Sequence, residues 1–177
     1  MSIVALAGRR VDAADARERR FPAANIDTVR GRIRDQLVAL GATTLVASGA
    51  AGTDLLGLEE AQRLGAHTLV ILPFDQAEFR AKSVEDRPDP AFWAALYERV
   101  TATSDVETLP QTFALESEAY SAATRRIIDR ATELATPNNV IALAVWDRRS
   151  RGADDHSEFF IRYAKERGLR VIEVSTL

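Results

Sequence analysis

Five short apolar segments spread along the chain limit its fold most strongly. Each is a nearly continuous run rich in Val, Ile, Leu and Ala, without the alternation of apolar and polar residues that a half-exposed strand shows. Strands with this composition are buried on both faces, as in a parallel sheet covered by helices on both sides. The predicted strands are Ile3–Ala7, Thr44–Ala47, Thr68–Leu72, Val140–Val145 and Arg170–Val174.

Helical patterns separate these strands. Apolar residues recur at helical spacing after each of the first two strands, between residues 92 and 134, and again before the last strand. The predicted order is β-α-β-α-β, then an irregular helical stretch, then α-β-α-β. This alternation predicts an α/β fold, a doubly wound, Rossmann-like open sheet of about five parallel strands in the order 3-2-1-4-5, with helices on both faces. We expect residues 1–177 to form one domain.

Composition excludes several classes of function. The net charge of −3 argues against a broad nucleic-acid-binding surface, which needs clustered positive charge. The absence of cysteine excludes disulfides, thiolate nucleophiles and cysteine-zinc sites. The apolar segments are too short to span a membrane, and the amino terminus has no signal-peptide pattern. We therefore expect a cytoplasmic protein with no membrane partner.

Three polar loops follow strands that meet near the point where the strand order reverses. In open parallel sheets, ligands bind at this point, beyond the carboxyl ends of the strands. The first strand is followed by Gly8-Arg9-Arg10, the second by the seven residues Ser48 to Asp54, and the fourth by Asp147-Arg148-Arg149. We predict that these loops form a binding site for a small molecule.

The second loop is the most informative. Ser48, Gly49, Ala50, Ala51 and Gly52 are all small, so a ligand could approach the backbone closely, and the helix that follows begins with unpaired amides that favour anions. The alternative is a tight turn in which Thr53 or Asp54 caps the helix. The neighbouring first loop favours phosphate binding. Because Asp54 would repel a phosphate, we expect it to cap the helix or to accept a sugar hydroxyl.

Other residues have two interpretations each. Arg9 could bind a phosphate or pair with acidic residues in segment 12–18. Tyr120 could be a core residue or could stack on a base. In the segment Asp154 to Glu158, Asp155 and Glu158 have the spacing of a capping box, which we favour over Mg²⁺ binding by Asp154 and Asp155.

The ordered set of motifs resembles a known superfamily. The segment from Ser48 to Leu56 is similar to a loop of the SLOG superfamily, which includes DNA-processing proteins of natural transformation and lonely-guy-type phosphoribohydrolases. The likeness is closer to a bacterial branch that is often attached to signalling modules such as nucleotide cyclases. The matching pieces are Arg20-Phe21-Pro22, Leu72-Pro73-Phe74, Phe79 with Ser83-Val84, Trp93, Glu118-Ala119-Tyr120 and Ala144-Val145-Trp146-Asp147.

This resemblance implies a site for a nucleotide or nucleotide derivative, with Gly8, Arg9, Ser48, Gly49 and Gly52 on the ligand. It also suggests a homodimer or an attached signalling domain as partner. One departure is that the Pro-Gly-Gly-x-Gly-Thr-x-x-Glu motif of the phosphoribohydrolases is absent. The corresponding residues, 152–158, contain two aspartates that oppose anion binding.

Three functions follow from these observations. The first is a sensing module for a nucleotide-derived, phosphate-bearing small molecule, whose site includes Ala50, Thr53, Asp54, Tyr120 and Asp147. The second is an N-glycosidase acting on nucleoside monophosphates. It needs a carboxylate near the glycosidic bond, and the candidates are Asp54, Asp147 and Glu158. The third is an interaction scaffold whose decayed pocket is closed by Trp146 or by arginine–aspartate pairs.

Overall fold

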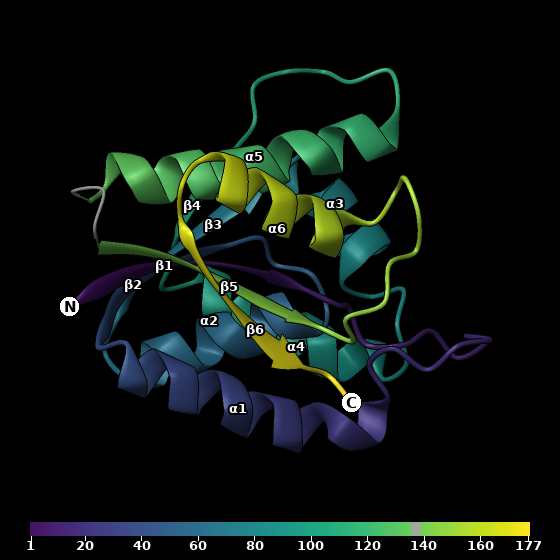
Figure 1. Ribbon diagram of the computed structural model, residues 1–177. Coiled ribbons are helices and arrows are strands. Elements are labelled where there is room, and N and C mark those ends of the chain that lie inside the picture. Colours follow the sequence, from purple (N-terminus) through teal and green to yellow (C-terminus); the bar gives the residue numbers. More distant parts are fainter. Residues whose placement is uncertain (136–138) are drawn as a thin grey trace.

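The computed structural model describes residues 1–135 and 139–177, and its strands join one parallel sheet (Figure 1). The strand order is β4-β3-β2-β1-β5-β6, so β1 lies between β2 and β5, where the winding direction reverses. The strands are β1 (Ser2–Gly8), β2 (Ala42–Ala47), β3 (His67–Leu72), β4 (Asp105–Thr108), β5 (Val140–Trp146) and β6 (Arg170–Ser175).

Helices cover both faces of this sheet (Figure 1). Helices α1, α2 and α4 pack on one face, and α5 and α6 pack together on the other. The helices are α1 (Ile26–Ala39), α2 (Thr53–Arg63), α3 (Gln76–Ser83), α4 (Pro90–Thr101), α5 (Glu116–Glu133) and α6 (His156–Glu166), and a 3₁₀ turn, η1 (Ala23–Asn25), precedes α1.

The hydrophobic core has two layers, one on each face of the sheet. Leu6 packs with Ile33 in the layer under α1 and α2, whereas its neighbour Ala5 packs with Ile128 and Phe160 in the layer under α5 and α6. Successive strand residues point to opposite faces, so both must be apolar when both faces are covered. This explains the continuous apolar runs of the sequence.

The prediction of five strands is wrong by one. The five predicted strands keep the predicted relative order, and β4 adds a sixth at the edge beside β3. The stretch predicted as irregular and helical contains α3, α4 and this strand. The sequence of β4, Asp-Val-Glu-Thr, has one apolar residue, because a partly exposed edge strand pairs on one side only and needs no continuous apolar run.

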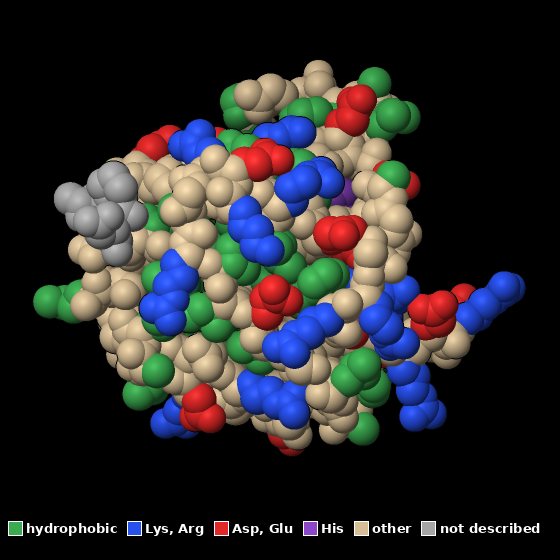
Figure 2. Space-filling model, viewed as in Figure 1, with side chains coloured by type: hydrophobic (Ala, Val, Ile, Leu, Met, Phe, Trp, Pro, Cys, Tyr) green, Lys and Arg blue, Asp and Glu red, His purple; other side chains and the backbone are tan. Residues whose placement is uncertain are grey.

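Two observations concern the length of the helices and the distribution of surface charge. No helix within residues 1–135 and 139–177 is both long enough and apolar enough to cross a bilayer. On the face shown in Figure 2, acidic and neutral side chains separate the arginines and lysines, which form no continuous basic stripe there. Such an arrangement does not favour nucleic-acid binding on this face.

Candidate ligand-binding site

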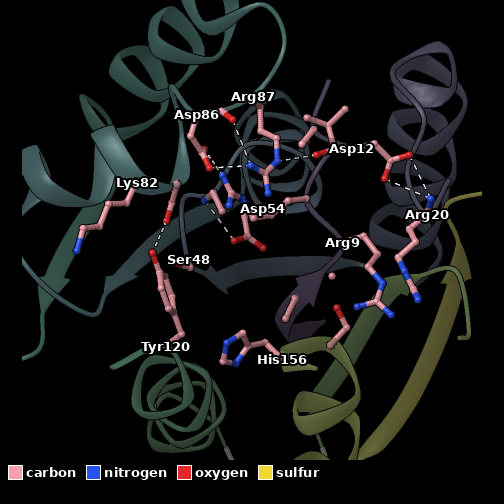
Figure 3. Close-up of a pocket in the computed structure, with 18 of the residues that line it drawn as sticks. Arg9, Asp12, Arg20, Ser48, Asp54, Lys82, Asp86, Arg87, Tyr120 and His156 are labelled. Atoms are coloured by element: carbon pink, nitrogen blue, oxygen red, sulfur yellow. Dashed lines mark hydrogen bonds and ion pairs between the residues drawn. The ribbon is translucent and has the colours of Figure 1, made fainter. Parts of the chain in front are cut away.

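A cavity of about 720 Å³ opens at the carboxyl ends of β1 and β2 (Figure 3). Its walls come from the segment after β1, the β2–α2 loop, α3 with the segment that follows it, and the amino-terminal parts of α5 and α6. The polar and aromatic lining residues used below are Arg9, Arg10, Ser48, Asp54, Phe79, Ser83, Asp86, Arg87, Tyr120, Arg151 and His156.

The structure brings most, but not all, of the predicted site residues to this cavity. Gly8, Arg9, Ser48, Ala50, Asp54 and Tyr120 line it. Four others lie behind its walls: Gly49, Gly52, Thr53 and Asp147. The location at the switch point of the sheet is the one that the sequence predicted.

The segment after β1 and the β2–α2 loop lie side by side. Arg10 and Gly52 form an isolated antiparallel bridge, and the Thr53 amide donates to the Arg9 carbonyl over 3.1 Å. Gly52 has a φ of +121°, and a Cβ there would lie 2.6 Å from the Val11 nitrogen. The position therefore requires glycine because the two backbones approach closely, and not because a ligand does.

Amides of the β2–α2 loop are already hydrogen bonded to other groups of the protein. The Ala50 amide donates to Asp54 Oδ2 over 3.2 Å, and the Ala51 amide donates to the Ser83 carbonyl over 2.9 Å. The Thr53 amide is bonded to Arg9, as described above. An anion site in a loop needs free amides that converge on one point. Three of the amides that the predicted phosphate-binding loop was expected to offer an anion are therefore already engaged within the protein.

Asp54 occupies the place where the phosphate was expected. Its side chain lines the cavity, although only 9% of the residue is exposed. Burial raises the pKa of Asp54 to about 7, and neither the Ala50 amide nor the charge of Arg10 offsets that effect. The N-cap residue of α2 is Gly52, and no side chain caps the helix. Asp54 instead accepts the Ala50 amide, so it closes the loop and does not cap α2.

Arg9 forms part of the cavity wall and is held there by buried carboxylates. Its guanidinium donates to Asp155 through Nη1 and Nη2, to Asp147 through Nε, each over 2.8 Å, and to the Arg149 carbonyl. Only 2% of Arg9 is exposed. The interpretation of Arg9 as an acid-paired residue is therefore the one that the geometry favours, but its partners follow β5 and do not lie in segment 12–18.

Asp155 also caps α6, as the sequence predicted. Its carboxylate accepts the amides of Ser157 and Glu158, and burial, which alone would raise its pKa, is outweighed by Arg9 and the amides of Glu158 and Arg151, so that the pKa falls to about 2. Both oxygens are engaged, which removes the main ligand of the Mg²⁺ interpretation with Asp154. In the part of the chain that the structure describes, no metal-binding cluster of three side chains occurs.

The remaining carboxylate candidates for catalysis point elsewhere. Asp147 pairs with Arg9, Arg20 and Arg149, and these contacts lower its pKa although burial acts in the opposite direction. Glu158 is hydrogen bonded to Ser150. Neither carboxylate lines the cavity. Of the three candidates, Asp54 alone faces the cavity.

Three arginines gather on one side of the cavity. Arg10 and Arg87 both pair with Asp86, and Arg87 also donates to the Val11 carbonyl over 2.8 Å. Burial, together with the charges of Arg10 and Arg151, lowers the pKa of Arg87. Burial and the charge of Arg9 do the same for Arg151. Arg10 and Arg87 share one carboxylate, and the carboxylate beside Arg151, Asp155 at 4.0 Å, is already bonded to Arg9. The result is a local excess of positive charge, which suits a multiply charged anion.

The opposite side of the cavity is aromatic and apolar. Tyr120, Phe79 and Ile127 line it, and the Tyr120 hydroxyl is hydrogen bonded to Ser83 Oγ over 2.7 Å. The His156 ring lies 5.7 Å from that of Tyr120, centroid to centroid. Burial, followed by the nearby charge of Arg151, lowers the pKa of His156. A neutral imidazole beside a tyrosine makes a surface that suits a planar ring.

Two solved structures share this fold. DNA processing protein A (DprA) from Streptococcus pneumoniae superposes with a TM-score of 0.55 at 15% sequence identity, over 97% of this chain and 49% of that one. At this level of identity, the likeness concerns the fold alone. The Moco carrier protein from Chlamydomonas reinhardtii superposes with a TM-score of 0.51 at 13% identity, over 98% of this chain and 75% of that one. The chain thus spans about half the length of the DprA chain.

Sequence comparisons add no family. No protein-family model matches this chain, and no curated protein sequence matches it.

Several lining residues were not predicted from the sequence. Asp86 and Arg87 follow α3, which the sequence did not place near the switch point, and Arg151 lies just beyond the predicted loop Asp147-Arg148-Arg149. Phe79 and Ser83 belonged to the family pattern, but nothing in their spacing gave them a role in the site. The charged residues of the segment that links α3 and α4 are visible in the sequence, but the sequence did not indicate that this segment would lie at the cavity.

Proposed function

We propose that this protein is a binding module for a nucleotide-derived, phosphate-bearing small molecule. The observation that carries the proposal is the division of one cavity into two sides of different chemistry. Arg87 and Asp86, to which Arg10 is also paired, lie on one side of Asp54, and the rings of Tyr120 and His156 lie on others (Figure 3). The charge of Arg151 acts on both Arg87 and His156. Ligand pockets of this size usually combine an apolar surface with a few polar groups that fix the ligand's orientation.

The charge of the site supports a ligand with more than one negative charge. Seven cationic side chains and five carboxylates line the cavity. Several of these charges compensate one another, as Lys82 does with Glu116. Asp86, which Arg10 and Arg87 share, neutralises only part of the charge of these two arginines. A phosphate ester or diphosphate supplies the missing negative charge, because guanidinium groups bind phosphate oxygens at two points.

The structural neighbours are compatible with this proposal, at the level of the fold. One of them is named as a carrier of Moco, and the other as a DNA-processing protein. We favour a small molecule over DNA for this chain, because its net charge is −3 and the arginines that we use line a cavity. The resemblance to the signalling branch leads us to propose a sensing role, with a homodimer or an attached signalling domain as the partner.

A second candidate function is hydrolysis of an N-glycosidic bond in a nucleoside monophosphate. One observation favours it, namely that Asp54 combines burial, contact with the cavity and a pKa near 7. Perturbed carboxylates in clefts are candidates for acid–base chemistry. Release of the free base from AMP by the wild-type protein, lost in Asp54→Asn, would support this function. Unchanged base release in that variant would remove Asp54 from it.

The scaffold hypothesis is not favoured. Trp146 donates to Glu173 over 2.9 Å and does not line the cavity. Arginine–aspartate pairs are present, but the buried ones that Arg9 forms lie behind the wall and leave the cavity open.

A thermal-shift screen tests the main proposal. The panel contains AMP, ADP, ADP-ribose and cyclic dinucleotides at millimolar concentrations, and at least one should raise the melting temperature, because a ligand that binds the folded state stabilises it. The shift should be lost in Arg87→Gln and kept in Arg99→Gln, whose exposed side chain pairs with Glu59 away from the cavity. No shift with any ligand, in wild-type protein that is folded by circular dichroism, would contradict the proposal.

A further inference from the structure

The β2–α2 loop has an unexpected relation to its own carboxylate. Asp54 Oδ2 accepts the Ala50 amide, so a group of the protein already holds the place at the start of α2 that a ligand phosphate takes in many nucleotide-binding folds. A phosphate placed there would compete with the Asp54 side chain for the Ala50 amide, and it would be repelled whenever that carboxyl group is ionised. The anion must therefore bind elsewhere in the cavity.

The arginine group is that other place. Arg10, Arg87 and Arg151 line the same cavity. Arg10 and Arg87 both pair with Asp86, whereas Arg151 does not. The Arg10 Nε atom is buried without a hydrogen-bond partner among the residues that the structure describes. Figure 3 shows Arg87 and Asp86 on one side of Asp54, and Tyr120 and His156 on others. Arg87 thus lies apart from Tyr120 and His156, with Asp54 between them, whereas Lys82 is paired with Glu116 near the aromatic side.

Asp54 itself retains an acceptor. Within residues 1–135 and 139–177, its Oδ2 atom accepts the Ala50 amide, whereas Oδ1 has no hydrogen-bond partner. The side chain is nine-tenths buried and lines the cavity. A carboxylate oxygen in this position accepts hydrogen bonds and repels anions, so the matching group on a ligand is a donor such as a hydroxyl.

We infer that the ligand is a phosphorylated ribose derivative with free ring hydroxyls, and that it binds with these hydroxyls on Asp54 and its phosphate on Arg10, Arg87 and Arg151. Asp54 is then the residue that sets specificity for the sugar. The phosphate lies across the cavity from the helix start that the glycine-containing loop forms. This inference rests on the proposed function and adds the orientation of the ligand to it.

The test compares AMP with its 2′,3′-dideoxy analogue by isothermal titration calorimetry. The two ligands differ only in the hydroxyls assigned to Asp54. The wild-type protein should bind the dideoxy analogue at least about tenfold more weakly, as expected for loss of hydrogen bonds to a charged group. In Asp54→Ala the two affinities should become equal to within about threefold. Asp54→Asn, which keeps the shape of the side chain, should retain part of the discrimination.

The outcomes separate this inference from the proposed function. If the wild-type protein binds AMP and the dideoxy analogue equally well, the inference is overturned while nucleotide binding stands. If Asp54→Ala binds both ligands more tightly by the same factor, Asp54 only repels phosphate and the hydroxyl role is wrong. If neither AMP nor any other nucleotide of the panel binds the folded protein, the proposed function fails and the inference fails with it. Circular dichroism of each variant shows whether the variant is folded.

Discussion

Arg9 and Asp155 lie 146 positions apart in the sequence, and their side chains form a two-point ion pair inside the protein. Both nitrogen–oxygen distances are 2.8 Å, and the Asp155 side chain is completely buried. The pair joins the end of β1 to the start of α6. It fixes the back of the cavity wall, so that loops from distant parts of the chain keep one arrangement.

Replacing Arg9 should be costly. In Arg9→Met the carboxylates of Asp147 and Asp155 stay buried and lose their shared partner, which typically destabilises a protein by about 3–5 kcal/mol. Urea unfolding measures the change in the free energy of unfolding. The control is Arg162→Ala, because its exposed pair with Glu166, at 3.9 Å, should contribute less than about 0.5 kcal/mol. Equal effects of the two substitutions would disprove the anchoring role.

Gly52 should not tolerate a side chain. Its φ of +121° is unfavourable for other residues, and an added Cβ would lie 2.6 Å from the Val11 nitrogen. We expect Gly52→Ala to lower the free energy of unfolding by about 1–3 kcal/mol. The matched control is Gly31→Ala in α1, where an added Cβ meets no atom within 4 Å, and a gain of roughly 0.5–1 kcal/mol is expected in a helix interior. A mild effect at Gly52 would mean that the two turns can separate.

The role of Tyr120, which the sequence left open, is separable by two substitutions. Tyr120→Phe removes the hydrogen bond to Ser83 but keeps the ring, so nucleotide affinity should be nearly unchanged. Tyr120→Ala removes the ring and should weaken binding by about 1–3 kcal/mol if a base stacks on it. Calorimetric titration with AMP measures both. Equal affinities for the two variants would place the base away from α5.

The pKa of Asp54 predicts an unusual pH dependence of stability. Its pKa rises from an ordinary value of 3.8 to about 7 in the folded protein, so between these pH values the folded state binds more protons than the unfolded state. Stability should therefore fall as pH rises from about 4 to 7. Asp54→Asn should remove this decrease and be more stable than the wild type at pH 8, with little difference at pH 4. Parallel pH profiles for both proteins, measured by urea unfolding, would contradict the raised pKa.

The fold was readable from the sequence wherever burial dictates composition. Ala5 and Leu6 face different layers of the core, and that requirement produces the continuous apolar runs from which five strands and their order were predicted. The edge strand β4 escaped because it is partly exposed and pairs only with β3, so its sequence carries no such pattern. Local patterns report burial on two faces much better than they report pairing at an edge.

The site was predictable in place but only partly in its chemistry. The switch-point rule pointed to the edge of the sheet where the cavity lies. The small residues of the β2–α2 loop were interpreted as room for a ligand, whereas Gly52 lies against the backbone that follows β1. Sequence alone did not show that the Ala50 amide is used by Asp54, or that Arg87 reaches the cavity from the segment after α3. Such contacts depend on tertiary geometry between elements, which spacing within one element does not encode.

Calorimetric titration of ADP into the wild-type protein and into Arg10→Gln/Arg87→Gln tests whether the cavity binds a nucleotide phosphate through these arginines. We expect one saturable site per chain in the wild type. We also expect an affinity at least about a hundredfold lower in the double variant, because two guanidinium contacts to phosphate are lost. Heats indistinguishable from dilution in the folded wild-type protein, or equal affinity in the double variant, would contradict it.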